Sequence, residues 1–174
     1  MLRVTGINDA IADLQREKRT ISDRLKELIE TLLNEGFSIA SAGFASADTS
    51  GVFDVHVVEP YWEGNTMVLA AEGANVAFIE FGTGVTYERY PDQSVYGNLG
   101  MADRGQYGLG KASKGTWIYV GRPGTLGEVI HTKKDGRTVV RTQGNPPARA
   151  MFRAGENMAS QDHINDIARR VFNK

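Results

Sequence analysis

The chain carries a long helical segment near its N-terminus, INDAIADLQREKRTISDRLKELIETLLN at residues 7–34. Its apolar side chains recur at alternating spacings of four and three, the heptad seam of a helix that packs lengthwise. The seam positions are Ile7, Ile11, Leu14, Lys18, Ile21, Leu25, Leu28 and Leu32. Asn8 as N-cap and Gly36 as stop predict a helix over residues 8–34, roughly 40 Å long. That is long for so small a chain, so the seam packs either on the chain's own sheet or on another chain.

Outward from this helix, the sequence period changes from helical to alternating. Strands are expected within residues 37–84, including the apolar runs Thr66–Ala71 and Val76–Phe81 and an alternation that ends at Pro60. Residues 116–143 predict a short strand and then a hairpin, because Asp135-Gly136 suits a tight turn with positive φ.

The C-terminal residues 146–172 return to a helical pattern. Asn145 is the expected cap, Pro146 or Pro147 suits the first turn, and Gly155 or Ser160 is a possible break. The whole chain, 1–174, therefore predicts one α+β domain with a long N-terminal helix, a mostly antiparallel sheet and a C-terminal helix.

Between these elements, residues 85–115 have no clear period and are rich in glycine and tyrosine. Loops of this length without structure of their own are usually functional or disordered. We interpret the segment as an extended arm that orders on a partner protein. The expected partner-binding residues are Tyr87, Tyr90, Tyr96, Arg104, Tyr107, Lys111 and Lys114.

The charge of the chain is nearly balanced but strongly segregated. The formal net charge is −1, with 20 Lys and Arg against 21 Asp and Glu, which argues against a dedicated nucleic-acid binder. Residues 36–102 hold eight acidic and one basic side chain, whereas residues 103–174 hold six acidic and thirteen basic. These segments either neutralise each other within one chain or meet on neighbouring copies.

Catalytic and metal-binding patterns are weak. The chain has no cysteine, which excludes disulfides and thiolate metal sites, and no apolar stretch predicts a secretory signal or a membrane span. The segment GQYGLGKAS at 105–113 fails as a phosphate-binding loop, because Ala112 stands where Ser or Thr must bind magnesium. His56, His131 and His163 lack paired-ligand spacing.

Acid–base chemistry has no better support. Glu59, Glu63 and Glu80 could converge, but their spacing does not require it, and no Gly-x-Ser-x-Gly elbow is present. We therefore predict no enzymatic activity, no catalytic residue, no metal and no cofactor.

Two short segments stand out from this background. The first is AFIEFGTG at residues 77–84, and the second is TQGNPPARAMF at residues 142–152. Taken alone, they predict a strand-to-loop corner and a loop-to-helix corner. Because Glu80 lies between two aromatic residues, we expect it to be partly desolvated and paired with Arg149.

Together, the two segments resemble the neck and tail-completion family of long-tailed bacteriophages, which are head–tail joining or minor tail proteins. The matching residues are Phe78, Glu80, Phe81, Gly82, Thr83, Gly144, Pro146, Pro147, Ala148, Arg149, Met151 and Phe152. The chain departs from the pattern at Ala150, where a proline is common, and in its unusually long loop rich in glycine and tyrosine. The order of elements also agrees over residues 8–160.

The resemblance implies a structural virion protein that forms a ring, usually hexameric, in the phage neck. Its partners would be copies of itself, the adjacent connector and the tail-terminator or tail-tube proteins, with double-stranded DNA passing through as non-specific cargo. It implies assembly in the host cytoplasm and no membrane. The alternatives are a tail-terminator ring that caps the tail tube and, more distantly, a small enzyme or a nucleic-acid-binding module.

Overall fold

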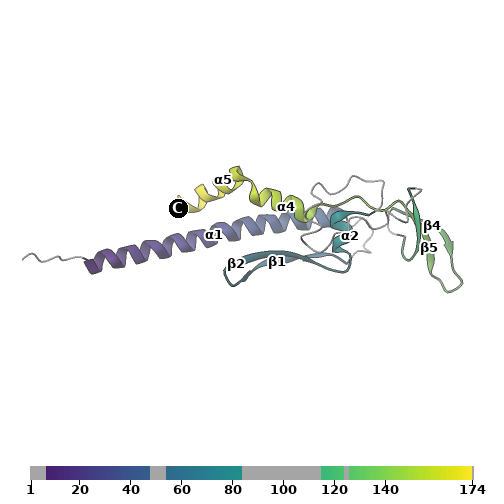
Figure 1. The fold of residues 1–174 in the computed structure, drawn as a ribbon, viewed down its shortest axis with the longest axis horizontal. Helices are drawn as coiled ribbons and strands as arrows, with labels where there is room; N and C mark the ends of the chain where they lie inside the picture. The colour runs from purple at the N-terminus through teal and green to yellow at the C-terminus, as the bar shows by residue number, and fades with distance from the viewer. Residues whose placement is uncertain (1–6, 48–53, 84–114, 124–125, 174) are drawn as a thin grey trace, which may run out of the picture.

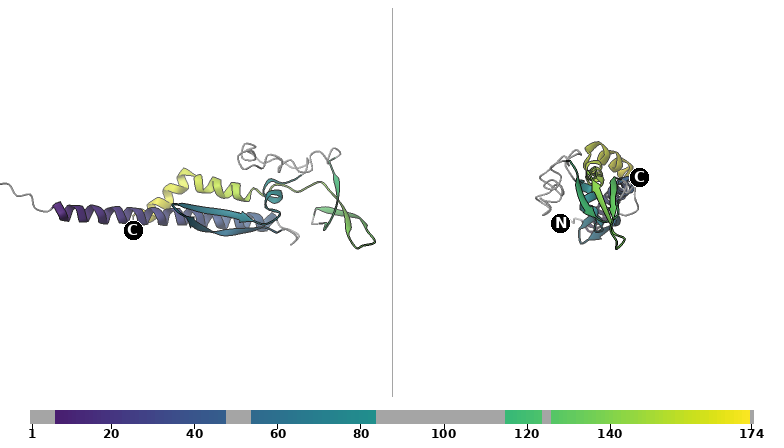
Figure 2. Two further views of the ribbon diagram at one scale, coloured as in Figure 1. Left: turned by 60° about the horizontal axis from the view of Figure 1, so that its bottom comes forward. Right: turned by 90° about the vertical axis from the view of Figure 1, so that its right-hand side faces the viewer.

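The computed structural model describes residues 7–47, 54–83, 115–123 and 126–173 of the chain. In chain order, the elements are α1 (Ile7–Ala47), β1 (His56–Glu63), β2 (Thr66–Glu72), α2 (Val76–Phe81), β3 (Trp117–Val120), β4 (Gly127–Thr132), β5 (Thr138–Thr142), α4 (Ala150–Ala159) and α5 (Gln161–Phe172). Helix α1 forms a long spine, with α4 and α5 along one side and the β1–β2 hairpin along another (Figure 1). Strands β3, β4 and β5 lie beyond the C-terminal end of α1, as a second view also shows (Figure 2). The predicted α+β class is confirmed.

Helix α1 is longer than predicted and does not end at Gly36. It has 41 residues and a length on the order of 60 Å. Gly36 and Gly43 lie inside it, facing α4: a Cβ on Gly36 would lie 2.6 Å from the Met158 sulfur, and one on Gly43 2.7 Å from the Ala150 Cβ. The glycine expected to stop the helix therefore allows a second helix to pack closely on it.

The prediction of strands throughout residues 37–84 is only partly right. Residues 37–47 continue α1, and the first sheet consists of the antiparallel strands β1 and β2. Strand β1 continues past Pro60, where it was expected to end, because the register shifts between Val58 and Tyr61. A proline is tolerated at such a bulge, since its missing N–H costs no ladder hydrogen bond there.

The apolar run Val76–Phe81 was predicted as a strand, but it forms the short helix α2. In helical geometry Ala77 and Phe81 share one face, where Phe152 of α4 packs against them. Six apolar residues carry too little periodicity to separate a buried helix from a buried strand. Packing against the rest of the molecule therefore determines that this segment is a helix.

The prediction for residues 116–143 is confirmed: β3, β5 and β4 form an antiparallel sheet in that order. Gly136 has φ 81° in the turn between β4 and β5, and the Lys133 N–H donates to the Arg137 carbonyl at 2.8 Å. The Arg137 side chain donates to the Asp135 carboxylate and holds the pKa of that group below its usual range.

The C-terminal helical region begins later than predicted and is divided into two helices. Helix α4 starts at Ala150, so Pro146 and Pro147 precede it and Asn145 is not its cap. The break is at Ser160, whose φ of −65° and ψ of 119° are extended, while Gly155 lies within α4.

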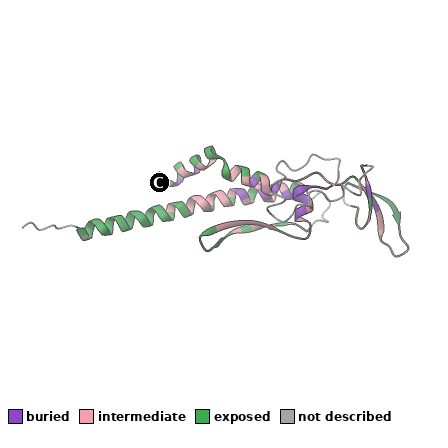
Figure 3. Ribbon diagram, in the orientation of Figure 1, coloured by how far each residue is buried: buried purple, intermediate pink, exposed green. Residues whose placement is uncertain are grey.

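The buried core lies where the C-terminal half of α1 meets α2, the start of α4 and the β1–β2 hairpin. Phe44, Ile79 and Ala150 form its centre, and Val57 and Ala71 of the hairpin pack against them. Figure 3 shows buried residues concentrated in this region, whereas the N-terminal half of α1 is exposed.

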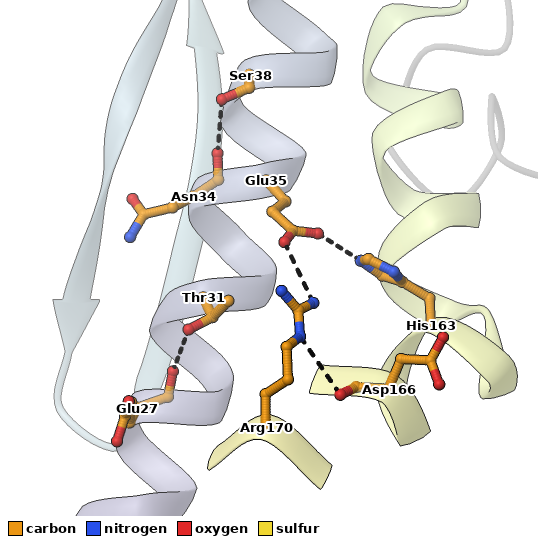
Figure 4. A network of polar contacts seen from close by, with 8 residues as sticks. All are labelled: Glu27, Thr31, Asn34, Glu35, Ser38, His163, Asp166 and Arg170. Carbon is orange, nitrogen blue, oxygen red and sulfur yellow. Dashed lines mark hydrogen bonds and ion pairs between the residues drawn. The ribbon is translucent and has the colours of Figure 1, made fainter. Parts of the chain in front are cut away.

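Helix α5 packs back along α1 through polar contacts at two levels. The Glu35 carboxylate lies 2.6 Å from His163 Nε2 and 3.9 Å from Arg170 Nη2 (Figure 4). Nearer the N-terminus of α1, Arg24 Nη1 donates to the Phe172 carbonyl at 2.8 Å, and its guanidinium lies 6.0 Å from the Phe172 ring centroid. Helix α5 therefore lies along the part of α1 between Glu35 and Arg24.

Candidate functional site

The two segments that stand out in the sequence meet at one corner of the molecule, which we call the Glu80 corner (residues 78–83 and 144–152). An isolated antiparallel bridge joins Thr83 to Asn145. The Ala148 N–H donates to the Ile79 carbonyl at 2.8 Å, and the Arg149 N–H donates to the Glu80 carbonyl at 3.2 Å. All the matched residues of both motifs belong to this corner.

The Glu80 carboxylate occupies the N-terminus of α4. Oε2 accepts from the N–H groups of Ala150 at 2.8 Å and Met151 at 3.1 Å, and Oε1 accepts from Phe152 at 3.0 Å. These donors have no intrahelical acceptor, and a negative charge there is favoured by the helix dipole. Glu80 is only 4% exposed, which confirms the predicted desolvation and makes these bonds strong.

The backbone at Arg149 directs α4 toward this carboxylate. Arg149 has φ 54° and ψ 32°, and it is the one non-glycine residue with positive φ among the described residues. A left-handed conformation costs an ordinary residue about 1–2 kcal/mol, so the surrounding contacts must hold it. The turn places the next three N–H groups of the chain around the Glu80 carboxylate.

A second set of hydrogen bonds holds the other edge of the corner. Thr83 N–H donates to the Asn145 carbonyl at 2.9 Å, and Asn145 N–H donates to Thr83 Oγ1 at 3.1 Å. Thr83 Oγ1 in turn donates to Asn145 Oδ1 at 2.5 Å, and Asn145 Nδ2 donates to the Phe78 carbonyl at 3.0 Å. Asn145, which the sequence suggested as a helix cap, therefore links the two segments.

Two glycines allow the segments to approach this closely. Gly82 has φ 72°, and a Cβ there would lie 2.7 Å from the Pro147 nitrogen. Gly144 has φ 98°, and a Cβ there would lie 2.1 Å from the Thr83 carbonyl oxygen. Both positions require glycine, for the backbone angle and for the contact.

The other residues considered for chemistry do not gather into a site. His56 lies on β1 beside Glu72 at 3.5 Å, His131 is exposed on β4, and His163 contacts Glu35. Glu59 and Glu63 are exposed on β1, whereas Glu80 is buried on α2. Within the described ranges, no group of three His, Asp or Glu residues could hold a metal ion, and no helix is long and apolar enough to cross a membrane.

The predicted partner-binding residues of the loop lie outside the described residues. These are Tyr87, Tyr90, Tyr96, Arg104, Tyr107, Lys111 and Lys114. Their role stays a prediction, as does the extended arm over residues 85–115.

The Glu80 corner is therefore suited to holding segments together. The helix N-terminus that could bind a phosphate or another anion already holds the chain's own carboxylate. Both segments stand out in the sequence, but only the structure reveals that they contact each other and that backbone N–H groups receive the Glu80 carboxylate.

The proposed ion pair between the Glu80 and Arg149 side chains stays a prediction and can be measured. A double-mutant cycle of Glu80→Ala and Arg149→Ala should give a coupling of at least about 1 kcal/mol in the free energy of unfolding. Urea denaturation of the four proteins measures this coupling. Strictly additive losses would show that the two side chains do not stabilise each other.

Comparison with known proteins adds no relative from which a function could be transferred. No family model, curated protein or solved structure matches the chain.

Proposed function

We propose that this protein is a structural component of a tailed bacteriophage, and that it forms a ring in the neck that joins the head to the tail. The observation that carries the proposal is the Glu80 corner. The residues that resemble the neck and tail-completion family form one hydrogen-bonded junction, with Glu80, Phe81 and Thr83 buried in it. Such a junction fits an architectural role, because it fixes the parts of each copy relative to one another and so fixes the surfaces that contact neighbouring subunits.

The charge distribution supports a ring closed by head-to-tail contacts. The described part of the β1–β2 hairpin carries the exposed residues Glu59, Glu63 and Glu72, and residues 54–83 hold no Lys or Arg. The β4–β5 hairpin carries Lys133 and Lys134 at its tip. Because these oppositely charged hairpins are at different places on the molecule (Figure 1), one copy can offer its acidic hairpin to the basic hairpin of the next.

Charge reversal tests this contact. Glu59→Lys with Glu63→Lys should prevent ring formation, and so should Lys133→Glu with Lys134→Glu, because each pair places like charges across the contact. Mixing the two variants should restore mixed rings, since the altered hairpins are again complementary. Electron microscopy and mass measurement of each sample, with and without the adjacent neck protein, give the result.

Asp162→Lys is a suitable control, because it changes an exposed charge on α5 outside both hairpins. In a phage that carries this gene, the variants that cannot form rings should give filled heads and free tails. Infectious particles that lack this protein altogether would contradict the proposed function. Rings unaffected by both reversals would contradict only the proposed contact.

A further inference from the structure

The N-terminal half of α1 presents an apolar stripe that the described part of the chain leaves uncovered. Its heptad positions Ile7, Ile11, Leu14, Ile21 and Leu25 are exposed, with Leu14 at 70% and Ile7 at 57%. Every described side chain from Ile7 to Asp23 is exposed. Figures 1 and 3 show this half of the helix extending beyond the other elements.

The same stripe is covered where it continues into the body of the molecule. Helix α5 contacts α1 at Glu35 and Arg24, which occupy the d and g positions of the heptad frame. Leu28 and Leu32 lie between those levels and are half-buried. The cover from α5 therefore ends near Arg24, which contacts Phe172 at the end of α5, and the exposed part of the stripe begins at Leu25.

The charges on this half of the helix are arranged as they would be around an interface. The b, c and f positions, which face away from the stripe, hold Asp9, Asp13, Arg16, Arg19, Asp23 and Lys26. Of the six e and g positions that flank the stripe, four are uncharged (Asn8, Ala10, Gln15 and Ser22) and two are charged (Glu17 and Arg24). Depletion of charge around an apolar centre is characteristic of protein interfaces.

We propose that residues 7–25 of α1 pair with the same residues of a second copy of this chain, as an antiparallel two-helix coiled coil. The spacing of the stripe is symmetric about residue 16, so an antiparallel copy matches it at every level. Ile7 then faces Leu25 of the second copy, Ile11 faces Ile21, and Leu14 faces Lys18. Each pair joins an a position to a d position, as antiparallel packing requires.

The antiparallel direction follows from α5 and from the charges near the centre. In a parallel pair, the two α5 helices would lie over the stripe at the same level and hold the two α1 helices apart. In the antiparallel pair, the second copy's α1 begins where α5 ends and covers the rest of the stripe. Glu17 of each copy then lies beside Lys18 of the other, so two acidic and two basic groups neutralise one another around the symmetry axis.

This contact is isologous and closes on itself, so it gives a dimer and not a growing chain. It uses a surface different from the charged hairpins of the proposed ring and does not depend on the phage function. The same antiparallel contact can form a free dimer, or it can join two rings through their α1 helices.

Disulfide formation tests both the contact and its direction, because the chain has no cysteine of its own. An equal mixture of Ile11→Cys and Ile21→Cys proteins should form a disulfide-linked heterodimer on mild oxidation, whereas neither variant alone should. Asp9→Cys mixed with Asp23→Cys is the matched control: these positions lie at corresponding levels on the outer face and should not cross-link. Efficient cross-linking of Ile11→Cys alone would indicate a parallel pair and overturn the proposal.

Sedimentation equilibrium provides the second readout. Where no ring forms, the unmodified protein should approach a mass of twice 19.0 kDa. Leu14→Asp should weaken dimerisation at least about tenfold, because it places a charge in the apolar centre of the pair. Ala12→Asp on the outer face should have little effect. A strictly monomeric protein at millimolar concentration would overturn the proposal, while leaving the head–tail joining assay unaffected.

Discussion

Replacing Glu80 by alanine should lower the free energy of unfolding by about 3–5 kcal/mol, because the change leaves one buried and two partly buried N–H groups of α4 without their carboxylate. That is a large part of the 5–15 kcal/mol typical of a folded domain. Urea denaturation followed by circular dichroism measures the loss. Hydrogen exchange should also show the first turn of α4 opening before the rest of the helix.

Two variants separate the cap from a general effect of charge. Glu80→Gln keeps one acceptor oxygen but loses the charge, so about half of the alanine loss is expected. Glu72→Ala removes an exposed carboxylate from β2 and should change stability by less than about 0.5 kcal/mol. Equal effects of Glu80→Ala and Glu72→Ala would show that the cap contributes nothing to stability.

Gly144→Ala should destabilise the protein by more than about 3 kcal/mol, since two separate costs add at that position. The first is the positive φ of 98°, which costs a residue with a Cβ about 1–2 kcal/mol. The second is steric, because the new Cβ would lie 2.1 Å from the Thr83 carbonyl oxygen and 2.6 Å from its carbon. These are backbone atoms, so the segments of the Glu80 corner must move apart.

Gly136→Ala isolates the first of these costs. Gly136 has φ 81°, and nothing lies within 4 Å of the Cβ that the substitution would add. It should therefore lose only the conformational cost, about 1–2 kcal/mol. Thermal or chemical denaturation that gives the same loss for both variants would show that the close approach at Gly144 carries no cost.

The sequence was sufficient for elements with a strong local signal. The heptad positions predicted the long helix, and Asp135-Gly136 predicted the turn of the β4–β5 hairpin, because both signals act over a few neighbouring residues. Gly36 was misleading, since a glycine before a close helix contact looks the same in sequence as a helix stop. Val76–Phe81 was misleading because its short apolar run fits a buried strand equally well.

The candidate site was predictable only in its parts. The two segments were recognised, and the burial of Glu80 followed from its aromatic neighbours. Their contact could not be derived, because more than fifty residues separate Thr83 from Asn145 and local patterns do not report such pairings. The N–H groups that receive the Glu80 carboxylate belong to the backbone, and no residue type identifies them in advance.

The bridge between Thr83 and Asn145 also makes the protein modular. Thr83 and Asn145 are directly paired, so the two ends of the long excursion of the chain between them are anchored at one point. The entropy of closing such an excursion grows only with the logarithm of its length, about 0.6 kcal/mol for each doubling. The excursion can therefore lengthen, shorten or exchange its contents at small thermodynamic expense, while α1, the first hairpin and the C-terminal helices keep their arrangement. The same framework can in this way present quite different hairpins at its far end.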